Sequence, residues 1–203
     1  MLKIKNNKLI KRCIIIASIV LCIIAIVAVG TKVNQNIIDK RNGIGEVLDT
    51  YKGVEVYYNG SDYGENHGKH YARDFYYYGY KWQCVEYVKR FYHDALDHKM
   101  PDVYGNAKDF FDEKVAQGEL NEKRGLIQYK NGEDEKPRTY DMLIFTDTTY
   151  GHIVIISEVG EDYIEVVQQN MGRESRDTFD LKCENGKYYI GGKRVPAGWL
   201  RKE

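Results

Sequence analysis

The chain has 203 residues, in which 30 lysines and arginines balance 30 aspartates and glutamates, so the formal net charge is zero. Without a basic excess, the composition argues against nucleic acid as the main ligand. Aromatic residues make up 13% of the chain and three residues are proline, which excludes a disordered protein.

The first 30 residues differ from the rest in charge and hydropathy. All five charged residues among them are basic, which leaves a formal charge of −5 on residues 31–203. Residues 13–30 form an apolar run in which Ser18 and Gly30 are the exceptions. Such a run gives about 27 Å of helix at 1.5 Å per residue, close to a hydrocarbon core of roughly 30 Å. We therefore expect a single transmembrane anchor at 13–30.

The basic flank predicts the orientation of this anchor. By the positive-inside rule, residues 1–12 stay in the cytoplasm and the rest of the chain faces outward from the cell membrane. We expect a stalk at 31–44 and a domain at 45–203. The alternative is a signal peptide that is cleaved after the small residues Ala28-Val29-Gly30, which would release a secreted protein.

Helical patterns precede strand patterns along the outward part of the chain. A strand is expected at 54–58, and 61–81 shows no clear period and is expected to be a loop. Apolar spacing predicts helices at 82–99 and 106–117. Period-two segments then predict strands at 142–146, 152–158, 162–170, 179–183, 187–190 and 197–200. Helices followed by antiparallel strands indicate an α+β fold.

Two cysteines lie outside the apolar run, Cys84 and Cys183. They could form one disulfide, or one of them could be a working thiol. Cys84 falls at the start of the predicted helix 82–99, where the helix dipole favours a thiolate. Cys183 is expected to be a buried thiol on a strand.

A nucleophilic thiol needs an imidazole that takes its proton and a third group that orients the imidazole. Of the five histidines, His152 opens a strong predicted strand. In an antiparallel pairing with the next strand, either Gln168 or Asn170 can stand beside His152. From spacing alone, Cys84 could equally be a small core residue and His152 a histidine that is merely hydrogen-bonded.

Four segments carry a resemblance to a known family: YGYKWQCVEYVKRFY (78–92), YDMLIFTD (140–147), YGHIVIISEVGEDYIEVVQQN (150–170) and AGWLRK (197–202). Together they resemble the CHAP family, the cysteine- and histidine-dependent amidohydrolases/peptidases. The likeness is strongest to the amidase half of bacterial glutathionylspermidine synthetase/amidase and covers about 45–203. It implies a papain-like CHAP domain, with helices packed on an antiparallel sheet.

The resemblance also assigns roles to residues. It implies Cys84 as nucleophile, His152 as base, and an oxyanion hole formed by the Cys84 backbone N–H and the Gln83 side chain. Where the family usually carries Glu-x-Asn, this chain has Gln168-Gln169-Asn170, so the asparagine matches and the glutamate does not.

The implied reaction is hydrolysis of an amide bond through an acyl-enzyme, with no metal ion or organic cofactor. An outward-facing enzyme meets peptidoglycan, so wall amide bonds are the expected substrate. A small-molecule γ-glutamyl or polyamine amide is the alternative within the enzyme class. A non-catalytic module that binds wall peptides or an envelope partner is the alternative outside it.

Two further groups have competing interpretations. His67 and His70 have a spacing that could serve a shared metal ion, but a solvated loop is expected because nothing nearby completes a ligand set. The tyrosines of 71–80 could form the lip of a substrate cleft or simply pack the loop.

Overall fold

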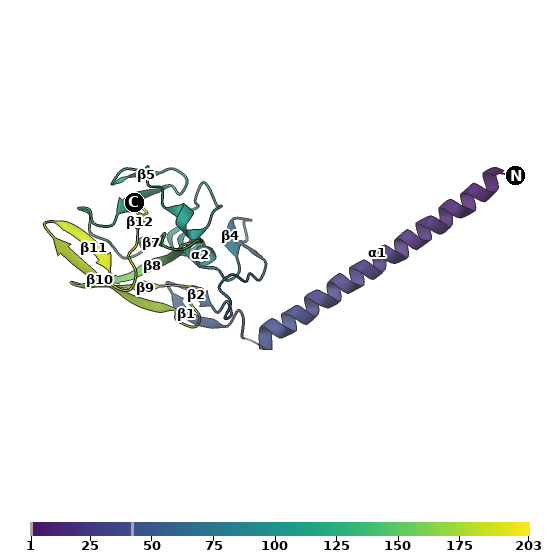
Figure 1. The fold of residues 1–203 in the computed structure, drawn as a ribbon, viewed down its shortest axis with the longest axis horizontal. Helices are drawn as coiled ribbons and strands as arrows, with labels where there is room; N and C mark the ends of the chain where they lie inside the picture. Colours follow the sequence, from purple (N-terminus) through teal and green to yellow (C-terminus); the bar gives the residue numbers. More distant parts are fainter. Residues whose placement is uncertain (1, 42) are drawn as a thin grey trace. The chain divides into compact units, whose positions relative to one another are not determined.

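The computed structural model describes residues 2–41 and 43–203, and it divides into two compact units, Met1–Gly43 and Ile44–Glu203. The first unit is the helix α1, Leu2–Arg41 (Figure 1). Its segment Arg12–Asn34 has a mean hydropathy of 3.2 and none of it is buried. By length and composition this segment can cross a membrane, although a signal sequence has the same properties. The helix also continues through most of the predicted stalk.

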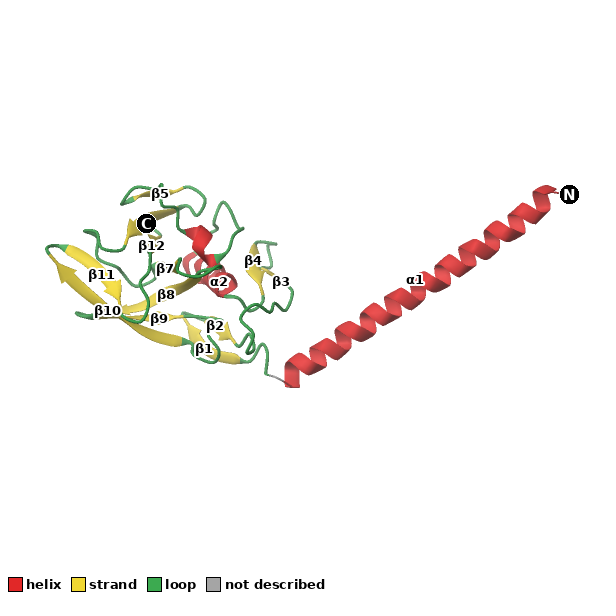
Figure 2. Cartoon of the chain, viewed as in Figure 1, coloured by secondary structure: helices red, strands yellow, loops and turns green. Residues whose placement is uncertain are grey.

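The second unit is built on an eight-stranded sheet with the order β11-β10-β9-β8-β7-β12-β6-β5, in which every neighbouring pair is antiparallel (Figure 2). Its strands are β5 (Glu119–Asn121), β6 (Leu126–Lys130), β7 (Met142–Phe145), β8 (His152–Val159), β9 (Tyr163–Val167), β10 (Arg176–Glu184), β11 (Lys187–Gly191) and β12 (Gly198–Arg201). Two hairpins stand outside this sheet: β1 (Val47–Tyr51) with β2 (Val54–Tyr57), and β3 (Lys69–Tyr71) with β4 (Tyr77–Tyr80). The predicted α+β class is confirmed.

The central strands β7 and β8 are buried on both faces of the sheet. Met142, Ile144, Ile153 and Ile155 belong to one apolar cluster, which includes the inner face of the helix α2. The residues between them, such as Leu143 and Val154, belong to a second cluster on the other face. Successive side chains of a strand point to opposite faces, so this alternation places the two clusters on the two sides of the sheet.

The helix α2 spans Cys84–Leu96 and packs on the first cluster. Val88, Phe91 and Tyr92 recur at helical spacing on its buried face and have no exposed surface. The helix ends where Asp97 adopts a left-handed conformation with φ 49°. The helix predicted at 82–99 is therefore confirmed, and Cys84 is its first residue.

The helix predicted at 106–117 is wrong. The chain forms a single 3₁₀ turn there, η1 (Ala107–Phe110), and then leaves in an extended conformation. The side chain of Gln128 on β6 binds both the backbone N–H and the backbone carbonyl of Asp112, at 3.0 and 2.7 Å. Because these two bonds tie the segment to the sheet, they replace the bonds that would continue a helix. The apolar pattern that predicted a helix includes Phe110, which is fully buried but lies in the 3₁₀ turn and not on the face of a longer helix.

The short strands β3, β4, β5 and β6 were not expected from the sequence. The segment predicted to be a loop at 61–81 contains β3 and β4, and β5 and β6 lie between the predicted helix at 106–117 and the predicted strand at 142–146. Strands of three to five residues with irregular burial carry too little period-two signal to be found.

Candidate active site

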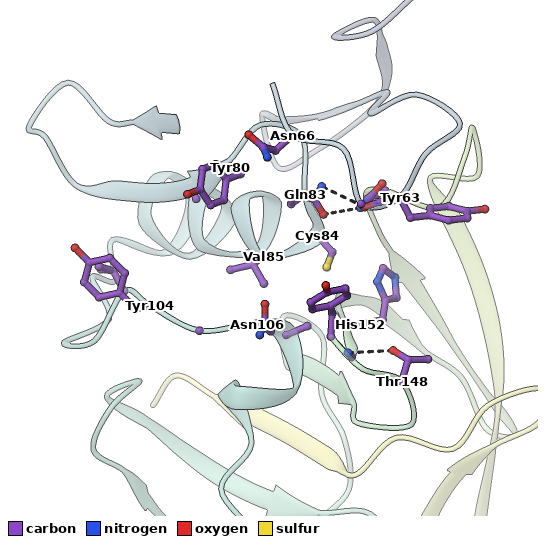
Figure 3. A pocket seen from close by; sticks show the side chains of 18 of the residues that line it. Tyr63, Asn66, Tyr80, Gln83, Cys84, Val85, Tyr104, Asn106, Thr148 and His152 are labelled. Atoms are coloured by element: carbon purple, nitrogen blue, oxygen red, sulfur yellow. Dashed lines mark hydrogen bonds between the residues drawn. The ribbon is translucent and has the colours of Figure 1, made fainter. Parts of the chain in front are cut away.

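A cleft of about 860 Å³ opens at the N-terminal end of α2 (Figure 3). Cys84 and His152 both line it. Six tyrosines line it as well: Tyr63, Tyr71, Tyr77, Tyr80, Tyr104 and Tyr150. Three of the tyrosines come from the 71–80 segment, so the cleft-lip interpretation applies to Tyr71, Tyr77 and Tyr80.

Cys84 sits in the first turn of α2 and is 9% exposed. Figure 3 shows its sulfur directed into the cleft, toward the imidazole of His152. Burial raises the pKa of the Cys84 thiol to about 11, although the backbone N–H groups of Ile153, Val85 and Cys84 act on the sulfur in the opposite direction. The contact with Ile153, the residue after His152, puts the sulfur at the mouth of β8.

His152 is the first residue of β8 and is 6% exposed. Gly151 before it has φ 72°, and a Cβ there would lie 2.5 Å from the Phe145 carbonyl oxygen and 2.6 Å from the Lys108 nitrogen. Glycine is the one residue that fits this close approach. The imidazole also lies against the ring of Phe145, with ring centroids 6.5 Å apart. Backbone and ring together fix where His152 stands.

Gln168 is the third group beside the imidazole. Its Oε1 lies 3.1 Å from His152 Nε2, so a proton on Nε2 is donated to Gln168 and Nδ1 remains for the thiol. The ladder between β8 and β9 pairs Ile155 with Val167. Extended along the strands, that register would put Asn170 opposite His152. The ladder ends at Val167, however, and Asn170 turns away with φ 67°.

The protonation of the pair follows from its surroundings. Burial lowers the pKa of His152 to about 4, while the hydrogen bond with Gln168 raises it only in part. Because Gln168 is neutral, it orients the ring without supplying a negative charge. The resting site near neutral pH is therefore a thiol beside a neutral imidazole.

Asn170 binds the oxyanion candidate Gln83 instead of His152. Its Nδ2 donates to Gln83 Oε1 at 2.7 Å, and its Oδ1 accepts from Asn59 at 2.9 Å. The Nε2 of Gln83 donates to the carbonyl oxygens of Tyr63 and Glu65, at 3.2 and 2.6 Å. An amide nitrogen has two hydrogens, so Gln83 must release one of these carbonyls before it can bind an oxyanion.

Gln169 lies between Gln168 and Asn170 in the chain, and its side chain binds the start of α2. Its Nε2 donates to the Gln83 carbonyl at 3.1 Å and to Glu86 Oε2 at 2.8 Å. Burial acts to raise the pKa of Glu86, but Arg90, His70 and Gln169 outweigh it and the pKa is lowered. The carboxylate is thus a buried anion in the first turn of α2. Sequence reasoning missed Gln169, because a lone glutamine next to a motif position carries no recognisable signal.

Another wall of the cleft, residues 103–107, is held by two buried basic side chains. Lys89 Nζ donates to the Val103 carbonyl at 2.7 Å, and Arg124 donates to the carbonyls of Asp102 and Tyr104, at 2.6 and 3.1 Å. Burial lowers the pKa of Lys89 to about 7. Carbonyl oxygens bound by buried donors make this wall a fixed part of the cleft.

Several other expectations have clear outcomes. Cys183 is exposed, not buried, and it and Cys84 are both free thiols. Cys183 lies on β10 two residues after Leu181, which is buried in the core, and the buried part of the strand ends before it.

His70 binds Glu86 at 2.7 Å and His67 binds the Asn59 carbonyl at 2.8 Å. In the part of the chain that the structure describes, no group of three metal-ligating residues occurs.

Comparisons with known proteins match the segment that contains this candidate site. The family model described as CHAP domain matches residues 75–170, a range that contains Gln83, Cys84, His152, Gln168 and Asn170. Trypanothione synthetase of Crithidia fasciculata is 30% identical over 136 residues, which cover 60% of this chain and 21% of that protein.

Bifunctional glutathionylspermidine synthetase/amidase of Escherichia coli (strain K12) is 28% identical over 128 residues, covering 56% of this chain and 20% of that protein. The same protein of Shigella flexneri matches equally. The chain thus spans about a fifth of the length of these relatives. The matched segment and the α+β architecture agree with a CHAP domain at residues 75–170.

Proposed function

We propose that the chain is a cysteine-dependent amidase or peptidase in which Cys84 is the nucleophile, His152 the base and Gln168 the group that orients the base. A CHAP domain implies amidase or peptidase activity. The observation that carries the assignment of residues is the shared cleft, in which the Cys84 sulfur faces an imidazole whose far nitrogen is bound by Gln168.

The reaction follows from these positions. Cys84 Sγ attacks the substrate carbonyl carbon while His152 Nδ1 takes the thiol proton, which gives a tetrahedral adduct. The adduct collapses to a thioester, and the C–N bond breaks as His152 gives the proton to the departing amine. Water then attacks the thioester with His152 again as base, which releases the acid and restores the Cys84 thiol.

The oxyanion of the adduct needs donors aimed at it. The backbone N–H of Cys84 lies in the first turn of α2, where N–H groups have no partner within the helix. Gln83 supplies a second donor once substrate draws its Nε2 from one of the two carbonyls that it binds. Asn170 still donates to the Gln83 Oε1 during this change, so the Gln83 side chain rotates about that hydrogen bond and stays in the cleft.

The substrate is proposed from topology. With residues 1–12 in the cytoplasm, 13–30 as the membrane anchor and 31–44 as a stalk, the domain 45–203 works outside the cell membrane. Its amide substrates are then those of cell-wall peptidoglycan. Support comes from the apolar segment Arg12–Asn34 and its basic N-terminal flank.

A second candidate substrate is a small-molecule amide of the glutathionylspermidine type. The observation that favours it is the 28% identity with a protein whose name includes that amidase activity. Both candidates use the same cleft and the same chemistry, and they differ in what flanks the scissile bond.

Zymography on purified wall separates catalysis from binding. We expect the full-length chain in detergent to clear the wall, and Cys84→Ala to bind it without clearing. Cys183→Ala is the matched control because Cys183 is a free thiol far along the sheet, on β10, and should keep full activity. Clearing by Cys84→Ala would remove Cys84 as nucleophile. If the unaltered chain binds wall without clearing it and does not hydrolyse glutathionylspermidine, the domain is a non-catalytic binding module.

A further inference from the structure

The cleft around Cys84 carries charge of one sign. Among the described residues that line it, Lys69 and Arg194 are cations, and none is an aspartate or glutamate. A cleft lined by one sign of charge focuses its field and concentrates molecules of the opposite charge. The charge of the lining therefore bears on which amides can enter.

Lys69 supplies the uncompensated charge. It lies on β3 opposite Tyr80, is exposed, and has no ion pair with any residue that the structure describes. Its ladder partner Tyr80 is in ring contact with Tyr77, whose ring also contacts that of Tyr104, at centroid distances of 6.5 and 6.0 Å.

Arg194 contributes less net charge, because its guanidinium forms two hydrogen bonds with the carboxylate of Asp147, which does not line the cleft. Its field still reaches the reacting groups, since its positive charge acts to lower the pKa of both Cys84 and His152, beside the larger effect of burial on each. Lys69 and Arg194 thus line a cleft whose described lining includes no carboxylate that could receive a cation.

We propose that this cleft selects peptide amides that carry a free carboxylate, with Lys69 as the pairing cation, and that it disfavours amides whose leaving group is a protonated polyamine. The turnover of such substrates rests on the proposed function, whereas the charge preference at Cys84 does not. A carboxylate gains from Lys69, while a polyamine meets like charge and finds no acidic partner.

The charge preference is measured by thiol labelling, without turnover. Anionic sulfonatoethyl and cationic aminoethyl methanethiosulfonate both convert the Cys84 thiolate to a mixed disulfide and release methanesulfinate. With the full chain in detergent at low salt, peptide mapping should show faster modification of Cys84 by the anionic reagent. Lys69→Glu should lower the anionic-to-cationic rate ratio about tenfold and Lys69→Gln by less, and salt should shrink both effects.

Lys182→Glu is the matched control, since Lys182 is an exposed strand lysine outside the cleft, and its ratio should equal that of the unaltered chain. The exposed Cys183 gives an internal reference in every sample. A ratio that favours the cationic reagent, or that changes equally with Lys69→Glu and Lys182→Glu, would overturn the proposal even if the enzyme is active.

The preference for substrates is then tested with soluble wall peptides and the same peptides after carbodiimide conversion of their carboxylates to carboxamides. We expect kcat/KM to fall about tenfold on conversion, and Lys69→Glu to abolish that difference. Equal rates on both preparations would contradict the carboxylate preference and leave the amidase assignment intact. No turnover of either, together with a normal labelling ratio, would contradict the proposed wall substrate and leave the charge preference intact.

Discussion

Three consecutive residues after β9 hold three different parts of the candidate site. Gln168 binds the imidazole of His152, Gln169 binds the backbone beneath Gln83, and Asn170 binds the Gln83 side chain. Neighbouring residues of an extended chain point to opposite sides, and the positive φ of Asn170 then supplies a third direction. Each of these contacts can be removed separately.

Replacing Gln168 with glutamate should move the pH profile upward. A carboxylate beside Nε2 stabilises the imidazolium, so it raises the pKa of His152 from its depressed value of about 4. His152 then loses its proton at higher pH. The acid limb of the kcat/KM profile, which follows protonation of His152, should therefore rise by about one unit, equivalent to roughly 1.4 kcal/mol.

This substitution removes no hydrogen bond, because the Gln168 Nε2 that becomes an oxygen has no partner among the described residues. Gln168→Met is the matched control: it should lower kcat through loss of ring orientation, with no upward shift of the profile. An unchanged profile for Gln168→Glu would show that Gln168 does not act on His152.

Asn170→Ala should lower kcat without moving the pH profile. Asn170 holds Gln83 and has no contact with His152, so its loss affects the oxyanion donor and not the base. We expect a fall of about tenfold to a hundredfold, below or near the loss measured when an oxyanion donor is deleted outright. Alkylation of Cys84 by iodoacetamide forms no oxyanion and should keep its rate. A slower alkylation would instead indicate that the whole cleft had been disturbed.

At the scale of elements, the turn between β7 and β8 decides where the base stands. Gly151→Ala should cost about 1–3 kcal/mol of stability from its positive φ and should lower kcat at least tenfold, because the new Cβ would push His152 off the Phe145 carbonyl and the η1 backbone. Urea unfolding in detergent and single-turnover kinetics measure the two effects.

Gly172→Ala provides the matched control, since Gly172 also has a positive φ, 61°, but a Cβ there would meet nothing within 4 Å. It should lose a similar strain energy and keep its kcat. If Gly151→Ala keeps kcat as well, the close approach at Gly151 does not position His152.

For the whole molecule, we expect the apolar segment to remain attached and to hold the protein in the membrane. The apolar run of residues 13–30 is longer than the 7–15 residues of a typical signal-peptide core. Carbonate extraction of membranes followed by Edman sequencing would decide it. A protein recovered in the soluble fraction with Thr31 as its first residue would refute the anchor.

The sequence predicts the fold best where an apolar pattern repeats over many residues. The helix α2 and the strands from β7 to β12 were expected, because their apolar residues repeat over enough positions to define a face. The 3₁₀ turn at Ala107–Phe110 was mistaken for a helix, since Gln128 lies distant in the chain and its two bonds to Asp112 cannot be inferred from local spacing.

Within the candidate site, the sequence by itself selected Cys84 and His152 as candidates, through a helix start, a strand start and the resemblance to the CHAP family. Which amide touches the imidazole was decided by tertiary structure, because the ladder ends at Val167 and Asn170 turns toward Gln83. The charge of the cleft was decided there as well. Lys69 and Arg194 are 125 positions apart in the chain, and only the closure of the fold around α2 brings both to one cavity.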